Sequence, residues 1–409
     1  MMWEFNYGEW TEAYVFLRLL GNGRIYAANK DFEKDENVYI DILKIIRYEK
    51  EHILEFKREL ESASGMDNGV VFKILTYDEL NDKADYLYKA IKNITSRKRK
   101  FPIQEIENYL TELRFSQPKV PKLPTEIQDE YGKKTDIIIT MQDSTDCAIS
   151  TTGFSIKSHL GSASSLFNAS LASKFVYELI GCDEKEMYNI NGNYISSEIG
   201  MFNYIKNNPN ISLKFVKTSE AFNDNLDFVE LKMPEILSCA ILTQIGYYER
   251  ANSSKTKDIV ENIARINPVN VRRPEIWYEA KIKDFLYASF SGLTASEPWD
   301  GRRKLSGGYI DVGNDGRMLY YRAVSDDVFN TFLYEHTFFD RPSRGVNKDI
   351  ARVVALANIE GRDVTAEEIR MVATKKDGKP KPKKGDWGYV YKGDDGKYYI
   401  SINFQVRFI

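Results

Sequence analysis

With 409 residues the chain exceeds one ordinary compact core, so we expect two or three domains. Hydrophobic residues make up 43 % and charged residues 29 %, the balance of a soluble globular protein, and no apolar run approaches the ~20 residues of a membrane helix. The net charge of −3 does not mark the surface as a whole as a nucleic-acid binder.

The first 130 residues are predicted to be mainly helical. Apolar residues recur at helical spacing over residues 11–20, and a short strand is expected over residues 24–28. The pattern is again helical from about Asp41 to Leu113. One helix there is marked by Ile45, Ile46, Ile53, Leu54, Phe56 and Leu60, and a second by Leu80, Ala84, Leu87 and Ile91. The proline-containing segment between Phe115 and Thr125 is predicted to be an extended connector that marks a subdomain boundary.

The next segment changes character. Residues 136–141 (DIIITM) and 153–158 (GFSIKS) are predicted strands, separated by small and polar residues that favour a turn. We then expect a helix over residues 165–179, a strand over residues 211–216 and mostly helices over residues 234–291. A hairpin is predicted over residues 307–324, around the turn residues Gly313 to Gly316. The chain ends in two predicted strands, over residues 388–392 and 397–408.

The two strands after Asp136 bring chemistry-bearing residues together. If they pair as an antiparallel hairpin with a turn near Asp146, Asp136 lies opposite about Lys157. Ser155 lies two residues before Lys157 and therefore shares its face of the sheet. Phosphodiester hydrolysis uses such an arrangement, because a carboxylate holds Mg²⁺ and a lysine positions or activates the attacking water.

An aspartate on one strand and an acid-x-lysine on the next is the signature of the PD-(D/E)xK nucleases. Here it reads Asp136 and Ser155-Ile156-Lys157, with serine where the second metal carboxylate is expected. The missing acid has two candidates, of which we prefer Glu12 on the first helix to Glu178. Asp143 and Asp146 could also bind metal, although acids in a polar turn more often cap the turn.

Longer stretches make the resemblance specific. The chain resembles the HpaII-type restriction endonucleases in four stretches: the opening GEWTEAYVFLRLLGNGRIYAA, the block TDIIITMQDSTDCAISTTGFSIKSHLGSASSLFNAS, the segment from Lys281 to Ile310 and the closing YISINFQVRF. Residues 346–386 look longer than that family expects. The resemblance covers almost the whole chain.

The resemblance implies a fold and an activity. The expected fold is α/β (α+β): a PD-(D/E)xK core with a mixed central sheet flanked by helices, a helical insertion and a β-rich C-terminal part. The expected segments are the first helix and strand (1–30), the helical insertion (31–130), the catalytic core (131–220) and a DNA-recognition region (221–409). The implied enzyme is a type II site-specific deoxyribonuclease that makes Mg²⁺-dependent double-strand cuts in a short palindrome, with a CCGG-like site as the default. Asp136 and Lys157 are implied to be catalytic, with Ser155 beside them and Asp136 and Glu12 on the metal. The partners implied are double-stranded DNA, a second copy of the chain and a cognate DNA methyltransferase in the same system.

Basic residues in clusters are candidates for DNA contacts. Arg302, Arg303, Arg341 and Arg344 lie near a predicted hairpin and could bind guanine, although a phosphate or surface role is the simpler interpretation for each alone. His159 lies two residues beyond Lys157 and could touch a phosphate. The remaining basic clusters, each equally interpretable as a solvated loop, are Arg97–Lys100, Arg272–Arg273 and Lys375–Lys384.

The three cysteines indicate the compartment. They lie far apart and form no CxxC pair, which argues against a zinc ribbon or a disulfide framework and favours a reducing cytoplasm. The first residues carry no basic stretch followed by an apolar one, so no secretion signal is expected. We therefore expect a cytoplasmic protein without a membrane anchor.

Two other functions remain open at this point. One is a structure-selective repair or recombination nuclease of the same superfamily, which would use the same chemistry but ignore base identity in a plain duplex. The other is a non-catalytic DNA-binding protein that happens to carry the strand pair. Metal-dependent cutting separates both nucleases from the last hypothesis.

Overall fold

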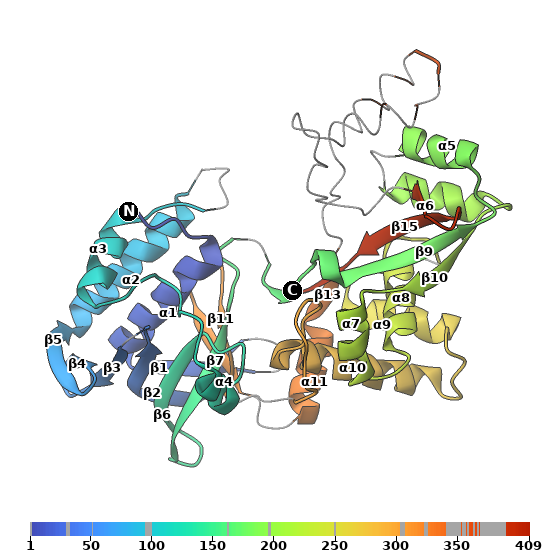
Figure 1. Cartoon of the computed structure of the whole chain (residues 1–409). Coiled ribbons are helices and arrows are strands. Elements are labelled where there is room, and N and C mark those ends of the chain that lie inside the picture. Colours follow the sequence, from blue (N-terminus) through green and yellow to red (C-terminus); the bar gives the residue numbers. More distant parts are fainter. Residues whose placement is uncertain are drawn as a thin grey trace. The chain divides into compact units, whose positions relative to one another are not determined.

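The structure is a computed structural model that describes residues 2–29, 33–50, 52–94, 100–161, 163–194, 198–248, 251–302, 307–322, 326–340 and 390–409, with single positions between 353 and 368. The chain divides into two compact units (Figure 1). Unit 1 consists of Met1–Ser164 and Arg303–Phe332, and unit 2 of Ser165–Arg302 and Leu333–Ile409. Each unit therefore combines segments that are distant in sequence, and their boundaries differ from the four segments expected above.

Unit 1 is built on one nine-stranded mixed sheet in the order β1-β12-β11-β7-β6-β2-β3-β4-β5. β11 pairs with β7, and β1 with β12, in parallel, whereas the other pairs are antiparallel. The strands are β1 (Arg24–Ala28), β2 (Lys34–Tyr48), β3 (Ile53–Arg58), β4 (Ser62–Asp67), β5 (Val70–Thr76), β6 (Ile137–Asp143), β7 (Ile149–Ser158), β11 (Gly308–Val312) and β12 (Met318–Arg322). The predicted mixed sheet with helices is confirmed, as are the strand pair β6–β7 and the hairpin β11–β12.

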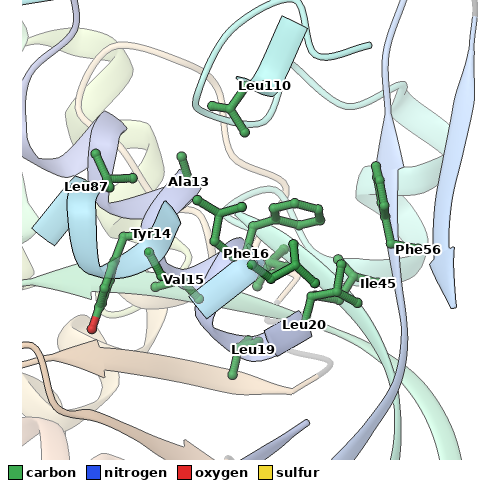
Figure 2. Packing of buried hydrophobic residues seen from close by; sticks show 14 of the residues in the cluster. Ala13, Tyr14, Val15, Phe16, Leu19, Leu20, Ile45, Phe56, Leu87 and Leu110 are labelled. Atoms are coloured by element: carbon green, nitrogen blue, oxygen red, sulfur yellow. The ribbon is translucent and has the colours of Figure 1, made fainter. Parts of the chain in front are cut away.

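Helix α1 (Tyr7–Asn22) lies at the centre of the unit 1 core. Asn6 and Glu9 form a capping box at its start, and Gly23 ends it in the left-handed conformation, with φ of 73°. Its apolar side chains pack against β2, β3, α2 (Tyr77–Lys92) and α3 (Gln104–Glu112), as Figure 2 shows. Phe16 makes edge contacts with Phe56 and Phe115, whose ring centroids lie 4.8 and 4.9 Å away. Both the first helix and the helix over Leu80–Ile91 are therefore confirmed.

The predicted helix that begins near Asp41 is wrong, because these residues form β2 and β3. The pairing of β2 with β6 shifts between Ile42 and Lys44, and this irregularity brings Ile42 and Ile45, three residues apart, to buried positions. The residues that marked the predicted helix come instead from two antiparallel strands, with Ile45 and Ile46 on β2 and Ile53, Leu54 and Phe56 on β3. In β3 the buried residues alternate in the ordinary way, and Leu60, which was assigned to the same helix, is fully exposed. The first half of the expected helical insertion is thus an extension of the sheet.

Unit 2 contains two smaller sheets and most of the remaining helices. The four-stranded sheet has the order β10 (Ser212–Lys217), β9 (Lys174–Ile180), β15 (Tyr398–Asn403), β14 (Val390–Lys392), and the three-stranded sheet the order β13 (Thr337–Asp340), β16 (Gln405–Phe408), β8 (Ser165–Phe167). The helices are α5 (Glu184–Tyr194), α6 (Glu198–Asn207), α7 (Glu220–Asp227), α8 (Met233–Gln244), α9 (Thr256–Ile266) and α10 (Pro274–Ser291). α4 (Thr125–Tyr131) belongs to unit 1, and α11 (Asp326–Glu335) contains the boundary between the units. The predicted strand over residues 211–216 and the predicted helices over residues 234–291 are confirmed, whereas the single strand predicted over residues 397–408 is two strands, β15 and β16, in different sheets.

The predicted helix over residues 165–179 is wrong. The segment forms β8, a short 3₁₀ turn at Leu171–Ser173 and then β9. Phe175, Tyr177 and Leu179 are buried while the residues between them are half-buried, which is the two-residue period of a strand. Phe404 organises this core, because its ring contacts those of Phe167, Phe175, Phe222, Phe285 and Phe339.

Candidate active site

Asp136 lies immediately before β6 and is held against β7. The register of the two strands runs from Ile137 opposite Phe154 to Gln142 opposite Ile149, and the Asp136 N–H donates to the Phe154 carbonyl at 2.8 Å. Asp136 therefore lies opposite Ser155 and not, as predicted, opposite Lys157. The turn is centred one residue earlier than assumed, which moves every partner by two positions.

Ser155 holds the carboxylate of Asp136. The Ser155 hydroxyl donates to Asp136 Oδ2 at 3.0 Å, and the Ile156 N–H donates to the same oxygen at 2.8 Å. Ser155 is only 6 % exposed. The serine that replaces an expected acid is thus a donor that orients the neighbouring aspartate.

Glu12 and Lys157 share the electrostatic environment of Asp136. Burial raises the pKa of Glu12 well above its ordinary value, and the negative charge of Asp136 raises it further. Burial also raises the pKa of Asp136, against the opposing effect of Lys157. Burial lowers the pKa of Lys157, although the charges of Asp136 and Glu12 oppose this shift. Two carboxylates and one ammonium, from α1, the start of β6 and β7, therefore form one coupled group.

Lys134 is a member of this site that the sequence did not single out. Burial and the positive charge of Lys157 lower its pKa to about 7, while Asp136 opposes the change. Its position two residues before Asp136, in the turn that leads into β6, is the signal that could have found it.

The two carboxylates, Glu12 and Asp136, are the groups that could hold a metal. Carboxylate oxygens are ligands that Mg²⁺ prefers, and two crowded acids with raised pKa values fit a divalent cation, which would favour their charged forms. In the part of the chain that the structure describes, no three Asp, Glu, His or Cys side chains gather as a metal site. The alternative acid, Glu178, lies on β9 in unit 2, where its carboxylate is 3.0 Å from Lys397 Nζ.

His159 follows β7 and pairs with an acid that was not predicted. Its Nε2 lies 2.8 Å from Asp311 Oδ1, and this hydrogen bond raises the pKa of the imidazole. Asp311 is on β11, in parallel register with Lys157, so the two residues share a face of the sheet. The imidazole is thus held beside the strand that carries Lys157.

The acids of the β6–β7 turn cap that turn. Asp143 accepts hydrogen bonds from the Thr145 N–H and hydroxyl, at 2.7 and 2.6 Å. Asp146 accepts from the Ala148 N–H at 2.9 Å. Asp143 also pairs with Arg322, which joins the turn to β12.

Only one of the predicted recognition arginines is described. Arg302 is exposed, belongs to unit 2 and lies 3.7 Å from Asp300, measured from Nε to Oδ2. The other basic candidates lie outside the described residues: Arg303, Arg341, Arg344, residues 97–99 and the run Lys375–Lys384. Most of the stretch 346–386 lies outside them as well.

Comparison with known proteins identifies the family. A sequence model of the HpaII restriction endonuclease family matches residues 6–348. The chain belongs to the HpaII restriction endonuclease family. The type II restriction enzyme HpaII of Haemophilus parainfluenzae is 33 % identical over 418 residues, which cover 99 % of this chain and 98 % of that protein. No solved structure matches the chain.

Membership confirms the predicted enzyme class. A member of the HpaII family is a type II restriction endonuclease, a deoxyribonuclease of restriction-modification, and DNA is its partner. No helix within the described ranges is long and apolar enough to cross a membrane.

Proposed function

We propose that the chain makes Mg²⁺-dependent double-strand cuts at a short palindromic DNA sequence, with a PD-(D/E)xK-type site composed of Glu12, Asp136 and Lys157. The observation that carries this proposal is that α1, the start of β6 and β7 bring Glu12, Asp136 and Lys157 close enough for their charges to act on one another, with Asp136 held on β7 by the Ser155 hydroxyl and the Ile156 N–H. A surface hairpin that merely contained the pattern would have no reason to bury an acid of α1 beside it.

Each residue has a role in this proposal. Asp136, oriented by Ser155 and the Ile156 N–H, and Glu12 would hold the metal. The ion would neutralise phosphate charge and lower the pKa of a bound water. Lys157 contacts the scissile phosphate or the attacking water, and burial lowers its pKa, which makes its proton easier to give up than that of an exposed lysine.

His159 and the arginines are proposed to contact DNA. An imidazolium held by Asp311 is a donor for a phosphate oxygen. Arg302, Arg303, Arg341 and Arg344 are proposed to include at least one base reader in addition to phosphate contacts. The target is proposed to be CCGG-like, which is the default that the family resemblance implies. A homodimer would match the two-fold symmetry of a palindrome, and a cognate methyltransferase would protect the host sequence.

The test of the chemistry is a digestion of defined DNA. Unmethylated duplexes with and without CCGG sites, and a branched duplex of unrelated sequence, are incubated with Mg²⁺ or with EDTA, and the ends are sequenced. We expect one discrete set of ends from the plain duplex, with Mg²⁺ only. Cutting confined to the branched substrate would support a structure-selective nuclease instead.

The test of the ligands compares two glutamates. We expect Glu12→Gln to lose cleavage roughly 10²-fold or more and to weaken metal binding, because Asp136 would remain as a lone acid. Glu178→Gln is the matched control and should cut like the wild type, because Glu178 pairs with Lys397 in unit 2. The reverse result would transfer the ligand role to Glu178.

A further inference from the structure

The connector between α3 and α4 supplies the hydrogen bond that Glu12 receives. Residues 115–124 form neither helix nor strand, and Val120 lies between Pro118 and Pro121. The Val120 N–H donates to Glu12 Oε2 at 2.9 Å. A backbone donor of this kind favours the charged form of a carboxylate and fixes its direction.

Arg47 of β2 holds the same connector from within the core. Its guanidinium donates from Nη2 to the carbonyls of Gln117 and Lys119, at 2.7 and 2.6 Å. It is only 4 % exposed, pairs with Glu49 at 2.6 Å and lies 3.9 Å from the centroid of the Phe115 ring. The arginine is therefore fixed on three sides: by an acid, by an aromatic ring and by the two carbonyls.

One peptide group joins the two sets of contacts. The Lys119 carbonyl, which accepts from Arg47, and the Val120 N–H, which donates to Glu12, belong to the same planar amide. In a trans peptide the C=O and N–H point in opposite directions, so fixing one end fixes the direction of the other. Donation to the carbonyl also polarises the amide and strengthens its N–H as a donor.

We propose that Arg47 is a positioning residue that acts through the Lys119–Val120 peptide to orient the Glu12 carboxylate for metal binding. This inference rests on the proposed function of Glu12. Without that peptide, Glu12 would lose the Val120 N–H that fixes the direction of its carboxylate, and the negative charge of Asp136 nearby would favour its turning away. Arg47 thus acts on the metal site although it contributes no ligand.

The primary test is Arg47→Lys, which keeps a positive charge beside Glu49 but has no planar fork to reach two carbonyls. Mn²⁺ binding to the protein is measured by calorimetry, and the Mg²⁺ concentration for half-maximal cleavage is measured separately. We expect Mn²⁺ binding and the Mg²⁺ midpoint to weaken together by roughly 10–100-fold, as for other residues that orient metal ligands. Saturating Mg²⁺ should restore most of the cleavage rate.

Arg58→Lys is the matched control. Arg58, on the adjacent strand β3, also donates to two carbonyls, those of Leu20 and Gly21, and its guanidinium lies 3.9 Å from the centroid of the Tyr77 ring. The carbonyls of Leu20 and Gly21 lie at the end of α1, about two turns beyond Glu12. Arg58→Lys should lose stability to a degree similar to that of Arg47→Lys but leave the Mn²⁺ affinity unchanged. A loss of folded protein lowers the amplitude of Mn²⁺ binding and does not change its midpoint.

Two further variants protect the inference from a folding artefact. Val120→Pro deletes the N–H while Arg47 and Glu49 remain, and it should reproduce the loss of Mn²⁺ affinity. Arg47→Lys added to Glu12→Gln should cause no further loss, because both changes act on one interaction. Wild-type Mn²⁺ affinity in both Arg47→Lys and Val120→Pro, or full additivity with Glu12→Gln, would overturn the inference. Normal cleavage by Asp136→Asn would instead refute the proposed function itself.

Discussion

Ser155 shows how a single residue changes role with its surroundings. At the position of an expected acid, it supplies no charge and instead donates to Asp136 together with the Ile156 N–H. The proposed second carboxylate, Glu12, comes from α1, 124 positions earlier in the sequence than Asp136, and burial together with the charge of Asp136 raises its pKa. The candidate site thus contains two acids and a lysine, with one acid supplied by another element.

The first prediction concerns Asp136 and Lys157. Asp136→Asn and Lys157→Met should each reduce cleavage by roughly 10²–10³-fold or more, because each removes a charge that acts on the phosphate or its metal. Both substitutions preserve side-chain size, so the thermal unfolding midpoint should stay close to that of the wild type. Cleavage rates are measured with excess enzyme, and wild-type rates in either variant would refute the site.

The second prediction concerns the pH dependence of His159. The pKa of His159 is raised by Asp311, so the folded protein binds this proton more tightly than the unfolded chain. The stabilisation is fully present below the ordinary histidine pKa of about 6.5 and is lost as the pH rises through the raised value. Asp311→Asn should remove this part of the pH dependence and return the His159 pKa toward its ordinary range. NMR titration of the imidazole checks the prediction, and an unchanged pKa would contradict it.

At the scale of elements, the strand pair β6–β7 needs a residue without a side chain. A Cβ on Gly153 would lie 2.5 Å from Thr135 Oγ1, 2.7 Å from Thr135 Cγ2 and 3.0 Å from Tyr131 Cβ. Thr135 directly precedes Asp136, so the segment that delivers the aspartate packs closely on β7. The close approach of this segment to β7 is therefore part of how the site is positioned.

The third prediction follows from that contact. Gly153→Ala should destabilise the protein by about 1–3 kcal/mol through overpacking and displace the segment that leads into Asp136. Cleavage should fall more than the loss of folded protein explains. Thermal unfolding and single-turnover rates are compared with Gly396→Ala, where a Cβ meets no atom within 4 Å but the backbone has φ of 81°. Gly396→Ala should lose stability but keep the wild-type rate of cleavage per folded molecule. An equal loss of cleavage per folded molecule in both variants would contradict the prediction.

At the scale of the whole molecule, the chain combines a unit that carries the proposed catalytic group with a unit that carries Arg302. Each unit is assembled from two separate stretches of sequence, so neither corresponds to a continuous segment. Two copies of the proposed catalytic group, one from each chain of a homodimer, would cut both strands of the proposed palindrome at once.

The fourth prediction concerns assembly and recognition. On a palindromic site the protein should bind as a homodimer, which light scattering of the complex with Ca²⁺ in place of Mg²⁺ measures.

Alanine at one of Arg302, Arg303, Arg341 or Arg344 should reduce discrimination between the site and single-base variants by roughly 1–3 kcal/mol. Neutralising several lysines of Lys375–Lys384 should weaken binding to all sequences and flatten its salt dependence. A single chain on the site, or unchanged discrimination in all four variants, would refute the corresponding part.

The sequence by itself determined the features that depend on local order. The strand pair around Asp136 and Lys157, the helix that carries Glu12 and the hairpin over residues 307–324 were all predictable, because alternation, helical spacing and turn residues act over short distances. The family was also readable, since its motifs are long and occur in order.

Only the tertiary structure decided the features that depend on pairing between distant segments. The apolar residues taken for one helix lie mostly on the paired strands β2 and β3, and a turn centred one residue earlier placed Asp136 against Ser155 instead of Lys157. Nothing local to Glu12 indicates that the Val120 N–H meets it, or that Arg47 holds the other end of that peptide. Asp311 and Lys134 likewise join the site through strand register and burial. Such contacts depend on the packing of several elements at once, and no short stretch of sequence encodes that packing alone.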